Sequence, residues 1–192
     1  VLYSNSTGNT LLHTAVIGSA GHMFTSLFYA FNNWNVCVIS PKVAEVRLLV
    51  GFCLQKMSRD KIRAFVDAKN EWGATALHLA ARANDETVVM LLLSAGADIE
   101  ALTNSDMTPL HKACQEGSLQ IVQLLLKSGA DAESRDDARS TPIHFAERKH
   151  RSDVIRVMLD AGALPTSRKL KKYAAITAET AKLLEDDRFS NI

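Results

Sequence analysis

Histidine is the residue whose spacing in this sequence most clearly suggests chemistry, because imidazole transfers protons and binds metal ions near neutral pH. His78, His111 and His144 follow one another at a step of 33 residues, and His13 precedes His78 by 65 residues, close to two steps. Four imidazoles in a regular series could form a metal array or a catalytic set. Stacked units would, however, place these rings about one unit apart, too far for a shared ion. We therefore predict structural histidines, hydrogen-bonded to neighbouring backbone or to a capping threonine.

Cysteine is the next candidate, as a nucleophile or a metal ligand. Cys37, Cys53 and Cys114 are too few and too scattered for a disulfide framework or a zinc cluster, and we expect Cys114 to be a buried thiol within a helix. Cys37 with His22 is the only conceivable nucleophile–base pair, and nothing in the sequence places the two together. The sequence has no glycine-rich phosphate loop, no Gly-x-Ser-x-Gly, no His-Glu-x-x-His and no Cys-x-x-Cys. We therefore predict no catalytic residue, no cofactor, no metal and no enzyme activity.

The elements that would position these side chains are indicated by the same step, which also separates two other residue types. They are Thr75, Thr108 and Thr141, and Gly96, Gly129 and Gly162. A fixed period of roughly 20–50 residues indicates one supersecondary unit stacked on copies of itself. In each unit the threonine can cap a first helix. Apolar residues spaced as at Val88, Val89 and Leu92 give a second helix one apolar face, and the glycine ends that helix. Each unit is thus predicted to be a helix, a turn, a helix and a projecting turn or hairpin.

Three motifs recur in a constant order along the chain. They are Thr-Pro-Leu-His-x-Ala at the first helix, as in Thr108 to Ala113 and nearly so in Thr141 to Ala146, then Val-x-x-Leu-Leu, then Gly-Ala-Asp. On these motifs the chain resembles the ankyrin-repeat family, strongly over about residues 70–163 and fairly well over 5–15. The resemblance implies an all-α ankyrin-repeat solenoid of stacked helix-turn-helix units with projecting hairpin turns. At its ends we expect an irregular N-terminal repeat with an insertion and a helical C-terminal cap.

The chain divides into three predicted parts. They are irregular N-terminal repeat sequence at 1–69, three consensus-like repeats at 70–163, and a helical cap and tail at 164–192. Residues 18–67 hold either a degenerate second repeat or one repeat with an insertion, and an aromatic stripe from Phe24 to Phe31 is expected to pack on an apolar helix at 43–57. In the cap, 165–173 and 177–187 are predicted to be two polar helices. Because the first residue is Val and 1–4 resembles the end of a preceding hairpin, we expect part of a longer protein.

The resemblance also implies where a partner binds, namely on the concave side made by the hairpin tips and the exposed part of each first helix. Carried onto this chain, the predicted partner-binding residues are Glu71, Trp72, Ala74, Arg82, Asn104, Ser105, Met107, Gln115, Glu116, Asp137, Ser140, Arg148 and Lys149. We expect Trp72 and Met107 to form the apolar centre of this site, because aromatic anchors dominate interface energetics and methionine adapts to its neighbours. The alternative for Trp72 is that it folds back near Phe65.

Charge narrows the kinds of partner. The formal net charge of +1 favours neither a nucleic-acid-binding nor a membrane-surface protein. We expect another protein or a peptide as the partner, with no nucleic acid, no direct membrane contact and no small-molecule ligand. From Arg139 to Lys172, nine Lys or Arg stand against three Asp or Glu. The run from Arg168 to Lys172 could be a nuclear-import signal or a patch for an acidic partner, and the alternative is a solvated capping helix.

The leading interpretation of the whole chain is a protein-interaction scaffold. Two alternatives stay open, which are the substrate-recognition part of a larger effector or enzyme and the cytosolic repeat domain of a membrane protein. Few cysteines and the lack of a signal-peptide pattern at the start favour an intracellular, cytoplasmic protein. The nucleus and delivery into a host cell are open alternatives for its location.

Overall fold

The computed structural model describes residues 10, 12 and 59–176. The predicted aromatic stripe, the apolar helix at 43–57 and the cap helix at 177–187 lie outside the described residues, as do His13, His22, Cys37 and Cys53. Within the described part, three helix pairs follow one another. They are α5 (Ala76–Arg82) with α6 (Glu86–Ser94), α7 (Pro109–Glu116) with α8 (Leu119–Lys127), and α9 (Pro142–Arg148) with α10 (Ser152–Asp160). Helix α4 (Arg59–Val66) precedes them, and a helix over 168–176 follows them.

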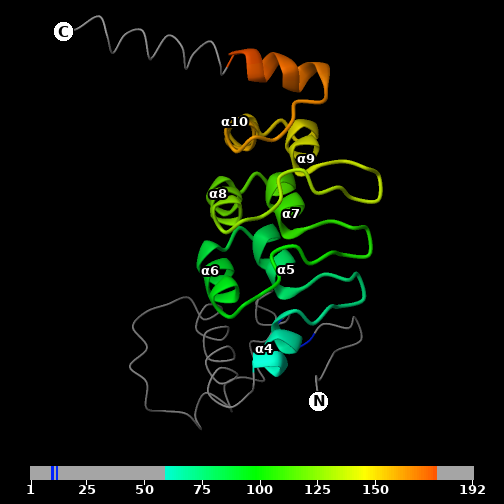
Figure 1. Cartoon of the computed structure of the whole chain (residues 1–192), viewed down its shortest axis with the longest axis vertical. Helices are drawn as coiled ribbons and strands as arrows, with labels where there is room; N and C mark the ends of the chain where they lie inside the picture. Colours follow the sequence, from blue (N-terminus) through cyan, green and yellow to red (C-terminus); the bar gives the residue numbers. More distant parts are fainter. Residues whose placement is uncertain (1–9, 11, 13–58, 177–192) are drawn as a thin grey trace, which may run out of the picture.

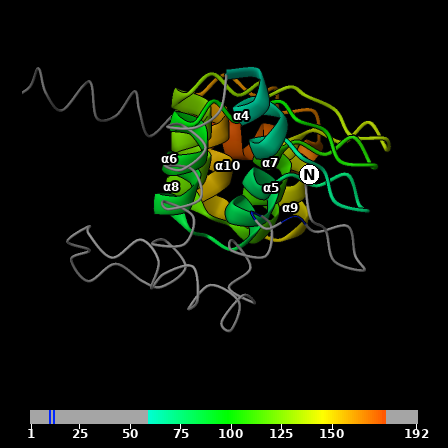
Figure 2. The same cartoon turned by 90° about the horizontal axis from the view of Figure 1, so that it is seen from below.

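The pairs stack so that the first helices form one layer and the second helices another (Figure 1). Helix α7 packs between α5 and α9, and α8 packs between α6 and α10. The loops that lead into α5, α7 and α9 project from one side of the stack, as Figures 1 and 2 show from two directions. The predicted all-α solenoid of helix-turn-helix units is confirmed. Among the described helices, none is long and apolar enough to cross a membrane.

A single apolar core runs through these units. Leu77, Leu110 and Ile143 take the same place in successive first helices, are at most 1% exposed, and belong to one cluster of buried side chains. Three small residues lie fully buried one turn further along, which lets the first helices approach closely: Ala80, Ala113 and Ala146. Because helices this short gain most of their stability from such packing, each unit depends on its neighbours.

The second helices end at glycines, as predicted. Gly96, Gly129 and Gly162 have φ between 86° and 95°, in the left-handed region that favours glycine. Two further positions in each unit also take this region, and glycine spacing does not reveal them. They are Asn84, Gly117 and His150 between paired helices, and Gly73, Asp106 and Arg139 in the projecting loops. The backbone geometry therefore repeats even where the residue type does not.

The C-terminal end of the stack is closed by the helix over 168–176. Leu170 is fully buried and joins the core cluster, and Tyr173 packs against it. The helix begins at residue 168 rather than at 165 as predicted. Pro165 precedes a side-chain cap, in which the Ser167 hydroxyl oxygen accepts a hydrogen bond from the N–H of Leu170 at 3.0 Å and sets the start of the helix. The division of the chain at residues 69/70 and 163/164 stays a prediction.

Candidate functional site

The recurring histidines link each unit to the next. Nδ1 of His78 accepts the N–H of Thr75 at 3.2 Å and lies 2.9 Å from its hydroxyl, while Nε2 lies 2.9 Å from the carbonyl oxygen of Met107 in the following loop. His111 makes the equivalent bonds one unit further along. A neutral ring that carries its proton on Nε2 satisfies all of these contacts. The predicted structural role is therefore confirmed for both histidines.

His144 ends this line differently. Its Nδ1 atom again meets the N–H and hydroxyl of Thr141, but Nε2 lies 2.6 Å from the hydroxyl of Thr166, an exposed side chain.

Burial lowers the pKa of His78 to about 4 and also lowers the pKa of His111, so both interior rings are neutral at pH 7. Their nitrogens are engaged in fixed hydrogen bonds, which makes them part of the architecture.

Cys114 matches the expectation of a buried structural thiol. It is fully enclosed in α7, and burial raises the pKa of its thiol. Since the thiolate is the reactive form of cysteine, a raised pKa suppresses nucleophilic chemistry at this site. Cys114 therefore acts as a small apolar side chain in the core.

Backbone hydrogen bonds join the projecting loops edge to edge. The N–H of Asn104 donates to the carbonyl of Trp72 at 3.0 Å, and the N–H of Asp137 donates to the carbonyl of Ser105 at 3.3 Å. Gly73 lies at the first of these junctions, where an added Cβ would come within 2.6 Å of the backbone nitrogen of Asn104. The loops therefore form one continuous edge, which we call the loop edge.

A buried side-chain oxygen at the base of each loop holds the loop in shape. Oδ1 of Asn70 accepts the N–H groups of Trp72 and Ala74, at 3.1 and 2.9 Å. Thr103 and Asp136, one and two steps further on, accept N–H groups of their own loops in the same way. Three residue types share one role here, so a search for identical residues misses them. A search for short side-chain acceptors at the repeat step would find them.

Trp72 is the main apolar side chain that the loop edge offers. It is 55% exposed, although its backbone N–H and carbonyl are both bonded. Met107, expected beside it, is half-buried against the core, and Nζ of Lys112 lies 3.1 Å from its sulfur. Ala74, expected at the surface, is buried, because both of its backbone groups bond to Asn70 inside the loop. The loop edge thus presents an exposed indole on an immobilised backbone.

The first helices add charge beside the loop edge. Arg82 and Glu116 are exposed at the ends of α5 and α7. Burial and the nearby charge of Arg82 lower the pKa of Lys112, and Glu116 opposes this shift. In α9 the guanidinium carbon of Arg148 lies 4.4 Å from the ring centroid of Phe145. Motif reasoning missed Lys112, because it occupies the variable position of Thr-Pro-Leu-His-x-Ala.

The predicted partner-binding residues divide by exposure. Eight are exposed: Glu71, Trp72, Arg82, Asn104, Glu116, Asp137, Arg148 and Lys149. Four are half-buried and one is buried: Ser105, Met107, Gln115 and Ser140, and then Ala74. The structure brings those of adjacent loops into contact through the junctions described above, while those of α5, α7 and α9 follow one another in the layer of first helices.

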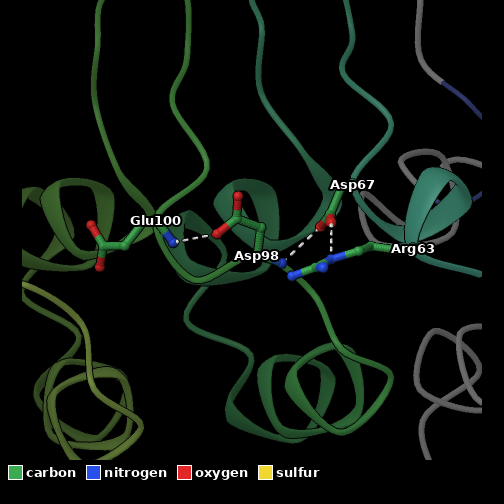
Figure 3. Close-up of polar contacts among 4 residues, drawn as sticks. All are labelled: Arg63, Asp67, Asp98 and Glu100. Atoms are coloured by element: carbon green, nitrogen blue, oxygen red, sulfur yellow. Dashed lines mark hydrogen bonds and ion pairs between the residues drawn. The ribbon is translucent and has the colours of Figure 1, made fainter. Parts of the chain in front are cut away.

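A second line of contacts, at the base of the loops, also crosses the unit boundaries. The carboxylate of Asp67 accepts the N–H of Asp98 at 2.8 Å, and that of Asp98 accepts the N–H of Glu100 at 3.0 Å (Figure 3). The same two bonds recur one unit on, from Glu100 through Asp131 to Glu133. We call these side chains the carboxylate line. It was not predicted from the sequence, because Asp67 stands where the next two units have glutamate and because the bonded partners are backbone groups.

The surroundings of the carboxylate line disfavour its negative charge. Burial raises the pKa of Asp67 and of Glu100, and the neighbouring carboxylate of Asp98 raises both further, while the bonded backbone N–H groups act in the opposite sense. Nε of Arg63 lies 3.9 Å from Oδ2 of Asp67 (Figure 3). Across residues 59–176, no group of three His, Cys, Asp or Glu could hold a metal ion. The hydrogen bonds from Asp67 to the N–H of Asp98 and from Glu100 to the N–H of Asp131 make the carboxylate line a structural bridge between units.

Comparison with known proteins agrees with this geometry. A family model described as ankyrin repeats (3 copies) matches residues 3–136 and 101–169. No curated protein matches the chain. The matched ranges cover most of the sequence, and they include every described helix pair and every junction of the loop edge. The chain therefore belongs to the ankyrin-repeat family.

Proposed function

We propose that this chain is a protein-interaction scaffold that holds a protein or peptide partner across its loop edge and first helices. Ankyrin repeats are generally protein–protein interaction modules. The observation that carries the proposal for this chain is the exposed indole of Trp72, presented from a loop that is fixed on both sides.

Fixation of the loop favours binding because association otherwise loses affinity to the ordering of loops and side chains. Asn70 holds the loop of Trp72 from within, and Asn104 holds it from the next unit. Gly73 leaves no space between them for a larger side chain. Tryptophan then contributes a large contact area with few rotatable bonds, as it does in many interface anchors. We place the apolar centre of the interface at Trp72, with the exposed part of Met107 beside it.

Charged side chains of both signs would surround this centre. Glu71 lies beside Trp72 in the loop, and Arg82, Glu116 and Arg148 follow at the ends of the first helices. Such rim charges set the orientation and the association rate of a partner more than its affinity. A partner with mixed charge and an apolar pocket for an indole fits this surface best.

The same observations favour a scaffold over an enzyme. Ankyrin-repeat proteins are typically non-enzymatic scaffolds, and the interior imidazoles of His78 and His111 are bonded on both ring nitrogens. We propose that these residues carry no catalysis. A recognition part of a larger effector, or a cytosolic domain of a membrane protein, would use the same face.

The test compares Trp72→Ala with Met90→Ala. Met90 is 47% exposed on α6, in the layer of second helices, and therefore serves as a matched exposed apolar control. Affinity capture with the full chain and mass spectrometry identify the partner, and calorimetry then measures its affinity. We expect Trp72→Ala to cost about 2 kcal/mol or more, roughly a 30-fold loss, and Met90→Ala to change little. Equal affinities of both variants, with unchanged unfolding midpoints, would contradict the proposal.

A further inference from the structure

The end of the stack around α9, α10 and the last helix carries a strong excess of positive charge. Nine Lys or Arg stand against three Asp or Glu between residues 139 and 172, and all nine are exposed. Residues 98–137 have the opposite balance, with eight Asp or Glu against three Lys or Arg. The described stack is thus negative in its middle and positive at its C-terminal end.

Two segments bring part of this charge together at what we call the basic corner. Its members are Arg148, Lys149, His150 and Arg151 at the turn between α9 and α10, and Arg168 and Lys169 at the start of the last helix. Nζ of Lys169 donates to Nδ1 of His150 at 3.2 Å, which joins the two segments. The last helix lies across this end of the stack (Figure 1). The corner is therefore built from separate parts of the chain that the fold holds in contact.

Among the residues that the structure describes, no acidic side chain forms an ion pair with the cations of the basic corner. The ion pair found in the described part of the chain joins Arg63 to Asp67, in another part of the stack. The nearest acidic residue in sequence, Glu147, is half-buried and accepts the hydroxyl of Ser167 at 2.8 Å. A concentration of exposed, unpaired cations attracts an anionic ligand and favours its binding.

The fold disfavours one of the two predicted uses of the run from Arg168 to Lys172. A targeting signal read as an extended peptide would have to leave the helix over 168–176. Leu170, in the middle of the run, is fully buried in the core cluster and would become exposed to water. The run therefore serves better as a folded surface than as a free signal.

We propose that the basic corner binds an acidic segment of the protein partner. The proposal rests on the proposed scaffold function, because Arg148 and Lys149 belong both to the basic corner and to the predicted partner-binding residues. A short acidic segment fits, since the positive region is bounded by the acidic units before it.

The aromatic side chains of this region also favour an acidic segment over single-stranded nucleic acid. Bases bind such proteins by stacking on exposed aromatic rings. Phe145 is 5% exposed and lies beneath Arg148, and Tyr173 is half-buried against the core. Within residues 139–176, the corner therefore offers charge without an exposed ring of Phe, Tyr or Trp beside it.

The experiment uses the full chain and a fluorescein-labelled peptide of about ten glutamates, with binding followed by anisotropy at about 50 and about 250 mM NaCl. The test variant is Lys149→Gln/Lys169→Gln. The matched control is Lys61→Gln/Lys127→Gln, which removes the same charge from exposed positions of α4 and α8. We expect binding at low salt that weakens several-fold at high salt. The test variant should lower the affinity about tenfold and the control less than about twofold.

Other outcomes would overturn the proposal. They are no binding of the peptide at low salt, equal losses in the two double variants, or tighter binding of a single-stranded DNA of about ten nucleotides than of the peptide. Trp72→Ala should leave the affinity for the peptide unchanged. Failure of the peptide test, with partner capture still sensitive to Trp72→Ala, would reject the basic corner and leave the scaffold function standing.

Discussion

Two lines of polar contacts cross the boundaries between units, and they use opposite chemistry. His78 and His111, which we call the imidazole line, are buried and uncharged, and each donates from Nε2 to a backbone carbonyl of the next unit. Asp67 and Glu100 are partly exposed, and each accepts a backbone N–H of the next unit. Both lines keep the step of 33 residues. The register between units is therefore held twice, once inside the core and once at its margin.

The two lines should differ in what they contribute to stability. A buried polar group that loses its partner costs about 1–3 kcal/mol, because water does not replace the lost bond. A group near the surface can turn to water instead and loses less. The imidazole line should therefore hold the units together, while the carboxylate line mainly sets the course of the loops.

The largest expected effect is that of His78→Ala. The substitution leaves the buried N–H of Thr75 without its acceptor, and it removes one of the two hydrogen bonds to the carbonyl of Met107, which keeps only the N–H of Thr103. We expect the free energy of unfolding to fall by about 3 kcal/mol. Glu100→Ala removes one acceptor from a partly exposed site, and we expect a loss of about 1 kcal/mol or less. Urea unfolding of the full chain, followed by circular dichroism, measures both.

His150→Ala is the matched control for this comparison. His150 is exposed and its ring bonds to Lys169, so its removal should change the free energy of unfolding by less than about 0.5 kcal/mol. A loss for Glu100→Ala as large as that for His78→Ala would refute the proposed division between core and margin.

Acid should separate the two lines, because their pKa values move in opposite senses. Burial holds the pKa of His78 at about 4 in the folded chain, against 6.5 in the unfolded chain. Its contribution is therefore complete above pH 6.5 and is lost as the pH falls towards 4. Burial raises the pKa of Asp67 and of Glu100. Their contribution is instead complete below their ordinary pKa values and is lost as the pH rises through the raised values.

We expect the imidazole effect to dominate the acid response, because the His78 shift is large and the carboxylates are screened by solvent. Stability should fall by on the order of 2 kcal/mol between about pH 7 and pH 4.5. In His78→Ala the fall should be clearly smaller, when urea midpoints are measured at both pH values. An identical acid response in both chains would show that other groups control it.

The imidazole line could be predicted from the sequence, and the carboxylate line could not. The histidines repeat as one residue type beside a capping threonine, so their spacing alone indicates their role. In the carboxylate line, Asp67 is followed one step later by Glu100, and the bonded partner is a backbone N–H that leaves no trace in the sequence. The left-handed backbone conformations of Asp106 and Arg139 could not be predicted either. Of the three equivalent loop positions, only Gly73 is a glycine.

The candidate site, too, could be predicted from the sequence only in part. Exposure of Trp72 followed from its place in a projecting loop that the fold does not require to be aromatic. Burial of Ala74 did not follow, because it depends on Asn70 turning the loop backbone inward. Lys112 occupies the position of the repeat motif at which the residue type varies. Its place beside the first helices' charged residues is therefore shown only by its neighbours in space, Arg82 among them.

The smallest expected effect tests the carboxylate line most directly. In Glu100→Gln the amide oxygen can still accept the N–H of Asp131, but the charge that burial and the nearby carboxylates disfavour is gone. We expect a gain of less than about 1 kcal/mol at pH 7, since solvent screens this partly exposed group. The gain should vanish near pH 4, where the glutamate of the natural chain is itself mostly protonated. Glu71→Gln, at an exposed loop position, should show no gain at either pH. A gain that persists near pH 4 would mean that the amide itself stabilises the contact between units. The charge of Glu100 would then have no effect on the free energy of unfolding.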